Sequence, residues 1–321
     1  MITSPQRLLV PVLLWLLSGC GGPPTIKQSP DTRSLRPLML LSERELSGQI
    51  LGQRLRQPLG LAVDRRGALY LSDAGNNRII RFEADFASHK EIGGYGSQPG
   101  LFDQPSFLVV DNDLNLIVSD AGNRRLARYN SRLNYVDEIS LTDDEDPLKY
   151  GFASGVAVNE YGEVWMCDRE NNRIAVFDNV GQFSRFIGEF GYSGGQLSNP
   201  EKIVYDSDEG FLVCDAGNSR IVVYDCFGNY ARQIADEAFE YPVAVALDSA
   251  HNLWVLDSST GRVFCFSKSG EKLLETGPHL PGTDRVLASP SDIAMLPDGR
   301  LVISDAGNHR VLICRIVIEG P

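Results

Sequence analysis

The stretch LYLSDAGNNR, residues 69–78, decides the fold because its second half recurs along the chain. The hexapeptide DAGNNR at 73–78 returns as DAGNRR at 120–125, DRENNR at 168–173, DAGNSR at 215–220, DSSTGR at 257–262 and DAGNHR at 305–310. Successive motif aspartates are 47, 48, 47, 42 and 48 residues apart. Six copies at so regular a spacing are typical of a chain built from one repeated structural unit.

Each motif lies within the same succession of short apolar runs. The first run opens at Pro58, Pro105, Ala153, Pro200, Pro242 or Pro290, and a second run ends at the motif aspartate. A third run follows the motif arginine, and a weaker, more polar run closes each copy. Runs rich in β-branched and aromatic residues between Gly, Asn and Asp turns predict strands. Four strands per unit of about 47 residues, six times over, predict an all-β, six-bladed β-propeller.

The pattern Pro-x5-Asp followed by Asp-x-x-Asn-x-Arg resembles the NHL repeat, and the resemblance covers nearly all of residues 47–318. It implies four-stranded blades whose strands run from a central channel outward. The last copy stops near Ile318 after three strands. We therefore expect residues 38–52 to supply its outer strand and close the ring, which makes 38–318 the propeller domain.

The motif residues are expected to be structural, because six near-identical copies cannot all form one catalytic site. Asp and Arg on either side of a tight turn can pair across two strands, and Asn tolerates left-handed turn geometry. In the fifth copy Thr260 replaces the asparagine. The residues are Asp73, Asn76, Arg78, Asp120, Asn123, Arg125, Asp168, Asn171, Arg173, Asp215, Asn218, Arg220, Asp257, Arg262, Asp305, Asn308 and Arg310.

The N-terminus is typical of an exported lipoprotein. Residues 1–19 hold one charged side chain, Arg7, followed by an apolar run, and they end in LSG before Cys20. This pattern predicts a signal peptide over 1–19 and resembles the bacterial lipobox, in which the cysteine carries lipid. A buried N-terminal helix is the alternative. Because no Asp follows Cys20, the resemblance implies the outer rather than the inner membrane, and the polar, Pro-rich residues 20–37 are expected to be a tether.

Composition limits the partners. The chain of 321 residues has 30 Lys and Arg against 42 Asp and Glu, a formal net charge of −12. An acidic protein lacks the concentrated basic face that a nucleic-acid binder needs, so we expect no nucleic-acid partner. No apolar run reaches the roughly 18–20 residues of a membrane span, so we expect membrane attachment only through the lipid on Cys20.

Motifs that would indicate catalysis or metal binding are weak. Residues 191–195, GYSGG, match G-x-S-x-G, but they fall in a loop between blades rather than in a strand-to-helix turn. Asp111, Asp113 and Asn115 resemble the start of a calcium loop without its glycine and glutamate, and we interpret them as a hairpin turn. None of the four histidines stands at metal spacing from another, so no catalytic residue, metal or cofactor is assigned.

Cysteines other than Cys20 are odd in number. They are Cys167, Cys214, Cys226, Cys265 and Cys314. Cys167 and Cys214 stand at equivalent points of neighbouring blades, which lie about 10 Å apart and so beyond disulfide reach. We expect all five to be buried free thiols.

Function is then expected to come from loops that depart from the repeat. Arg124, Arg169, Glu170 and His309 lie in the motif loops, whereas Glu201, Lys202 and Asp292 follow the opening prolines near the channel mouth. These residues form the candidate binding face. We expect a monomeric, non-catalytic scaffold of the bacterial cell envelope that binds a protein or glycan. The alternative is an exported lyase or lactonase-type hydrolase with a calcium or zinc ion in the channel.

Overall fold

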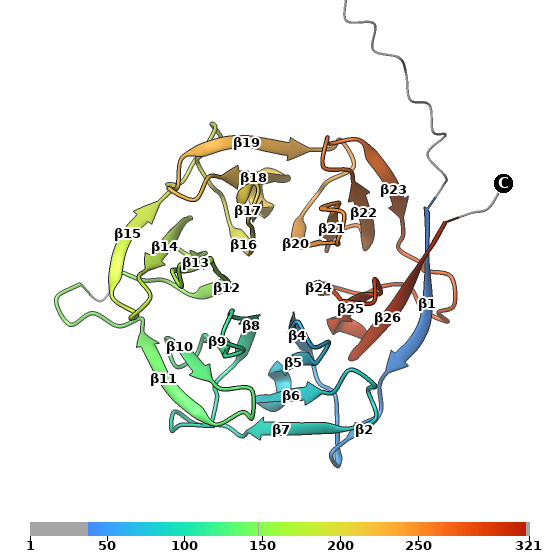
Figure 1. The fold of residues 1–321 in the computed structure, drawn as a ribbon, viewed down its shortest axis with the longest axis horizontal. Helices are drawn as coiled ribbons and strands as arrows, with labels where there is room; N and C mark the ends of the chain where they lie inside the picture. The colour runs from blue at the N-terminus through green and yellow to red at the C-terminus, as the bar shows by residue number, and fades with distance from the viewer. Residues whose placement is uncertain (1–37, 147, 319–321) are drawn as a thin grey trace, which may run out of the picture. The chain divides into compact units, whose positions relative to one another are not determined.

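The computed structural model describes residues 38–146 and 148–318. The predicted signal peptide, Cys20 and the predicted tether lie outside these residues. Six four-stranded antiparallel sheets surround a central axis within the described part, which confirms the predicted six-bladed β-propeller (Figure 1). None of the helical segments in these ranges has the length and hydropathy of a membrane span.

Blades 1 to 5 each begin at the innermost strand and proceed outward in chain order. Blade 1 consists of β4 (Pro58–Val63), β5 (Leu69–Asp73), β6 (Arg78–Phe82) and β7 (His89–Gly93). Blade 2 consists of β8 (Pro105–Val110), β9 (Leu116–Asp120), β10 (Arg125–Tyr129) and β11 (Tyr135–Ser140). Blade 3 consists of β12 (Ala153–Val158), β13 (Val164–Asp168), β14 (Arg173–Phe177) and β15 (Phe183–Ile187). Blades 4 and 5 consist of β16 (Pro200–Asp206), β17 (Gly210–Asp215), β18 (Arg220–Tyr224) and β19 (Tyr230–Ala235); and β20 (Pro242–Leu247), β21 (Leu253–Asp257), β22 (Arg262–Phe266) and β23 (Lys272–Thr276).

Blade 6 joins the two ends of the described chain. Its inner strands are β24 (Pro290–Met295), β25 (Leu301–Asp305) and β26 (Arg310–Ile318), and its outer strand is β1 (Leu38–Leu46). Leu38 lies opposite Ile318 and Leu46 opposite Val311 in the antiparallel register. The expected closure by the N-terminal segment is therefore confirmed, and it pairs the edge that β26 would otherwise expose. A short hairpin, β2 (Gln49–Ile50) and β3 (Gln53–Arg54), leads into blade 1.

The hydrophobic core lies between neighbouring blades rather than at the axis. All residues of the second strands β5, β9, β13, β17, β21 and β25 are buried, because each sheet is covered on both faces. Trp165 of blade 3 stacks on Phe211 of blade 4 with ring centroids 3.7 Å apart. Such apolar contacts repeat around the ring and fix the blades relative to one another.

The motif turns fasten each blade to the segment that arrives from the preceding one. In blade 1 the Asp73 carboxylate accepts hydrogen bonds from Arg78 Nε at 2.7 Å, from Asn76 Nδ2 at 2.8 Å and from the Arg56 backbone N–H at 2.7 Å. The same Asp–Arg pairs form in blades 2, 3, 4 and 6. Short 3-10 turns η1 (Ala74–Asn76), η2 (Ala216–Asn218) and η3 (Ala306–Asn308) carry three of the motifs.

Two expectations about the motif need correction. The left-handed residue follows the motif asparagine instead of being the asparagine itself, as at Asn77 (φ 51°) and His309 (φ 55°). In blade 5 the Arg262 guanidinium pairs with Glu275 at 2.8 Å, and Asp257 accepts hydrogen bonds from Thr260 instead. The loop before blade 5 spans only residues 236–241, against 188–199 before blade 4, so it offers less backbone for a motif arginine to bind.

Candidate functional site

The two ends of the propeller carry different loops. We call the motif face the end formed by the motif turns and the loops between blades. The turn face is the opposite end, formed by the turns that join first to second strands and third to fourth strands. Each first strand has a register irregularity just after its opening residue, as between Pro58 and Leu61. A bulge there re-aims the residues that follow the opening proline toward the channel.

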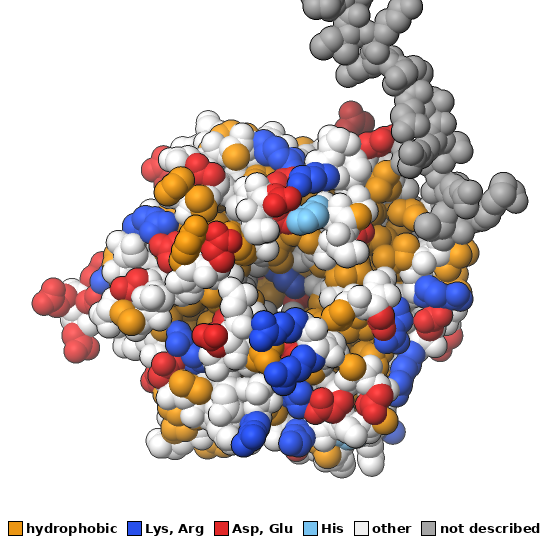
Figure 2. All heavy atoms as spheres, viewed as in Figure 1, with side chains coloured by type: hydrophobic (Ala, Val, Ile, Leu, Met, Phe, Trp, Pro, Cys, Tyr) orange, Lys and Arg blue, Asp and Glu red, His pale blue; other side chains and the backbone are white. Residues whose placement is uncertain are grey.

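A cavity of about 810 Å³ opens at the channel mouth on the motif face. Its lining includes the residue after each blade's opening position, namely Leu59, Ser106, Ser154, Glu201, Val243 and Ser291. Figure 2 looks down the propeller axis onto one end of the ring and shows the central channel as a hollow. All six blades therefore contribute to one pocket, which we call the mouth pocket.

A polar cluster lies on one wall of the mouth pocket. The buried Glu201 carboxylate accepts a hydrogen bond from Tyr241 Oη at 2.8 Å and one from Ser154 Oγ at 3.1 Å. Arg169 Nε lies 3.2 Å from the same carboxylate, and the Arg169 side chain is 48% exposed. The cluster thus holds a guanidinium at the rim of the pocket, where a ligand can reach it.

The ionisation of this cluster follows from its burial. Burial raises the pKa of Glu201 above its ordinary value, although Arg169, Tyr241 and Ser154 act in the opposite direction. Burial, reinforced by the nearby Glu201 carboxylate, raises the pKa of Tyr241 to about 12. Tyr241 therefore remains a hydrogen-bond donor at neutral pH.

Beneath the mouth pocket, an ion pair crosses the channel. Lys202 of blade 4 reaches past blade 5 and pairs with Asp292 of blade 6, and its ammonium also donates to the Ile293 carbonyl at 2.8 Å. Asp292 is fully buried and accepts a further hydrogen bond from the Leu61 N–H of blade 1 at 2.7 Å. Burial raises the pKa of Asp292 even though Lys202 opposes the shift. On its other side, Lys202 lines a smaller, mostly aliphatic cavity of about 380 Å³.

The structure brings only part of the predicted binding face together. Arg169, Glu201 and His309 line the mouth pocket, and His309 Nδ1 accepts a hydrogen bond from the Gln57 N–H at 3.1 Å. Lys202 and Asp292 lie below it. Arg124 and Glu170 are exposed in motif loops and are not among the described residues that line the pocket; Arg124 Nη2 donates to the Tyr150 carbonyl at 2.8 Å.

Sequence reasoning missed Tyr241 and Ser154. Tyr241 directly precedes the opening Pro242, where the other repeats have Gln57, Gln104, Phe152, Asn199 and Ser289. Because this position varies from repeat to repeat, the sequence comparison does not mark Tyr241 as a site residue. Ser154 carries no signal either, because Ser106 and Ser291 stand at the same position.

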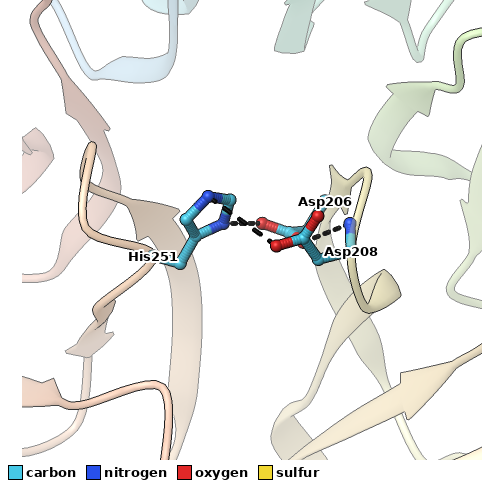
Figure 3. A group of neighbouring side chains, drawn as sticks. All are labelled: Asp206, Asp208 and His251. Atoms are coloured by element: carbon cyan, nitrogen blue, oxygen red, sulfur yellow. Dashed lines mark hydrogen bonds and ion pairs between the residues drawn. The ribbon is translucent and has the colours of Figure 1, made fainter.

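A second group of titratable side chains lies on the turn face (Figure 3). His251 Nδ1 is 2.7 Å from Asp206 Oδ2, and His251 Nε2 is 4.0 Å from Asp208 Oδ2. These side chains are close enough to hold a metal ion, a grouping that the sequence did not suggest because 45 residues separate Asp206 from His251. Lys268 Nζ, however, lies 2.7 Å from Asp208, and backbone N–H groups bind Asp206. We interpret the group as a set of polar contacts that joins blades 4 and 5.

Other sequence predictions concern the turns and the thiols. Asp111 accepts hydrogen bonds from the N–H groups of Asp113 and Asn115, as expected of a hairpin turn. Cys167, Cys214, Cys265 and Cys314 are buried free thiols. The expectation of burial is wrong for Cys226, which is partly exposed because it lies in the turn between β18 and β19.

Comparison with known proteins adds to this geometry. The model of the NHL repeat matches residues 55–82, 150–177, 197–224 and 287–314. The protein brain tumor of Drosophila melanogaster is 26% identical over 126 residues, which are 39% of this chain and 12% of that protein.

Similar solved structures include a streptogramin B lyase, with a TM-score of 0.63 and 14% identity over 88% of this chain and 98% of that one. A catalytically inactive virginiamycin B lyase from Staphylococcus aureus with quinupristin has a TM-score of 0.60 and 18% identity over 85% and 84% of the two chains. At these identities the likeness concerns the fold. Together with the closed ring, it shows that the chain has a six-bladed β-propeller fold, in which the NHL repeat model matches four segments.

Proposed function

We propose that the protein is a non-catalytic interaction propeller that binds a segment of a partner protein at the mouth pocket. The lipid on Cys20 would anchor it at the bacterial cell envelope, in the outer membrane in preference to the inner one. The observation that carries the proposal is a preformed pocket with the Arg169 guanidinium at its rim and the exposed Phe152 in its lining.

Exposed aromatic residues gather on the motif face. Phe152 lines the mouth pocket, and Tyr95, Phe190 and Tyr192 lie in loops between blades. Phe190 and Tyr192 pack edge to face with ring centroids 5.8 Å apart. Aromatic residues and arginine are enriched at the centres of protein interfaces, where they provide large contact areas at low entropic cost.

The channel chemistry supports binding over metal-dependent catalysis. The enzyme alternative requires a divalent cation in the channel. In the described channel, the position next to Asp292 is taken by the Lys202 ammonium, which repels a second cation. Metal analysis of the purified protein tests this point, since stoichiometric calcium or zinc that is lost in Asp292→Asn would favour the enzyme.

The partner proposal is tested by crosslinking and pull-down from the native envelope with the full chain. We expect Arg169→Ala to weaken capture of the partner at least about tenfold, the effect typical of an interface hot spot. Arg66→Ala is the matched control, because Arg66 is an exposed arginine in the β4–β5 turn on the opposite face. Equal capture by all three proteins would refute a partner site at the mouth pocket.

Attachment is tested separately. We expect Cys20→Ser to move the protein from the membrane fraction to the soluble fraction, because it removes the thiol that would carry lipid. Immunoblots of the two fractions give the result, and continued membrane retention of the variant would count against the anchor.

A further inference from the structure

The described chain begins and ends on the turn face. Strand β26 starts at Arg310, directly after a motif turn, and therefore runs from the motif face to the turn face. Strand β1 is antiparallel to it, with Leu38 opposite Ile318. The described chain thus enters the propeller on the turn face, which is opposite the mouth pocket.

The distance along the chain from Cys20 to this entry point is short. Seventeen residues, 21–37, separate Cys20 from Leu38. A chain of that length spans at most roughly 60 Å when fully extended, and about 23 Å on average as a flexible coil. The average span is close to the radius of gyration, about 19 Å, of a compact domain of some 280 residues. A lipid on Cys20 would therefore keep the turn face closer to the bilayer than the motif face.

Three hydrophobic side chains stand out from neighbouring turns of blades 3 and 4 on this face. Tyr161 is 68% exposed, Val180 73% and Phe227 77%. The two turns of blade 3 touch one another, since a Cβ on Gly162 would lie 3.1 Å from Asn179. The turn of blade 4 reaches blade 3, since a Cβ on Gly228 would lie 2.5 Å from the Ile187 side chain of β15. Glu160 is the main cause of the raised pKa of Tyr161, and the nearby Cys226, beside Phe227, adds to it. We call Tyr161, Val180 and Phe227 the turn-face patch.

The composition and size of the turn-face patch fit a lipid surface. Aromatic side chains with a polar tip, such as Tyr161, favour the boundary between headgroups and acyl chains. Three side chains are too few for a standard protein interface, which takes about 20–30 residues on each side. They are sufficient for a shallow contact that adds to a covalent lipid anchor.

We propose that the turn face lies against the bilayer that holds the Cys20 lipid, with the turn-face patch in its interfacial layer and the mouth pocket directed away from it. The inference rests on the lipid anchor of the proposed function. It adds an orientation: the partner would approach from the side opposite the membrane.

Cys226 provides a native reporter, because the other four described cysteines are buried. The full-length lipidated protein, labelled at Cys226 with a fluorophore, is reconstituted into phosphatidylethanolamine–phosphatidylglycerol vesicles that contain a nitroxide headgroup lipid. The control carries Cys226→Ser with Gln98→Cys, which places the label on an exposed loop of the motif face. We expect quenching to be about threefold stronger at Cys226 than at position 98, because headgroup quenchers act only near the interface.

Each outcome decides one part of the inference. Equal quenching at the two labels, or stronger quenching at position 98, would overturn the orientation while the membrane-bound fraction still shows the anchor. Recovery of the wild-type chain in the soluble fraction, as for Cys20→Ser, would defeat the anchor and the orientation together. Val180→Ser with Tyr161→Ser should abolish the difference between labels without releasing the protein. A preserved difference in that variant would overturn the role of the patch.

Discussion

Two layers of buried charge lie near the motif face, and they differ in symmetry. The motif layer repeats one arrangement, in which an aspartate at the end of the second strand binds an arginine five residues later, in five of the six blades. The channel layer has no repetition: Glu201 binds Arg169 and Tyr241, and Lys202 binds Asp292 across the axis.

Whether a charge pair is repeated distinguishes residues that build the fold from residues that are candidates for recognition. A repeated pair solves the same problem in each blade, because it fastens the blade to the loop that precedes it. A unique pair in the channel does not follow from the repeat, since the other blades have Leu, Ser or Val at the position of Glu201, and Gly, Phe or Ala at the position shared by Lys202 and Asp292. Unique charges in a pocket are accordingly the better candidates for recognition.

The largest expected effect comes from the motif layer. The Arg310 side chain is fully buried and pairs with Asp305, whereas the Arg262 side chain is 43% exposed and pairs with Glu275. Arg310→Ala should lower the free energy of unfolding by about 3–5 kcal/mol, because it leaves a buried carboxylate without its partner. Arg262→Ala should cost less than about 1 kcal/mol, as for exposed ion pairs. Urea unfolding of both variants measures the difference between these two losses of unfolding free energy. Equal losses would show that the different arginine pairing of blade 5 does not change its contribution to stability.

The channel ion pair should give an intermediate effect. Lys202→Met should lower the free energy of unfolding by about 2 kcal/mol at neutral pH, because Asp292 then carries an uncompensated charge close to two cavities. The Lys202→Met, Asp292→Asn double variant should recover most of this loss, because it removes the charge and keeps the Leu61 N–H bonded.

The pH dependence of Lys202→Met follows from the raised pKa of Asp292. A carboxyl whose pKa is higher in the folded than in the unfolded state binds protons more readily when folded, so its contribution to stability falls as pH rises. Loss of Lys202 removes an opposing influence and raises that pKa further. The deficit of Lys202→Met should therefore be largest near about pH 7.5 and shrink toward about pH 5, as Asp292 takes up a proton. Urea unfolding at both values checks this, and a deficit that grows on acidification would contradict it.

Much of the fold follows from sequence because the same pattern of strands and motif residues recurs six times. The spacing of the motif aspartates gave six blades, and the missing fourth run of the last copy gave closure by the N-terminal segment. The candidate site follows less directly, because its residues meet across the ring. Lys202 and Asp292 are 90 residues apart, and Tyr241 acts on Glu201 from the next blade. A repeat comparison marks Glu201, Lys202 and Asp292 as unusual, but only the geometry of the ring shows which residues touch.

The smallest expected effect tests why blade 5 departs from the motif. In other blades the motif asparagine also donates to a carbonyl of the preceding loop, as Asn76 does to Arg54 and Asn218 to Gly191. If the short loop 236–241 causes the departure, restoring the asparagine cannot restore this contact. Thr260→Asn should then change the free energy of unfolding by less than about 0.5 kcal/mol, the range of substitutions that gain no buried contact. A stabilisation above about 1 kcal/mol, the net value of a hydrogen bond, would contradict this. It would mean that a carbonyl of the short loop can still accept a hydrogen bond from an asparagine, and that Thr260 itself causes blade 5 to differ from the motif.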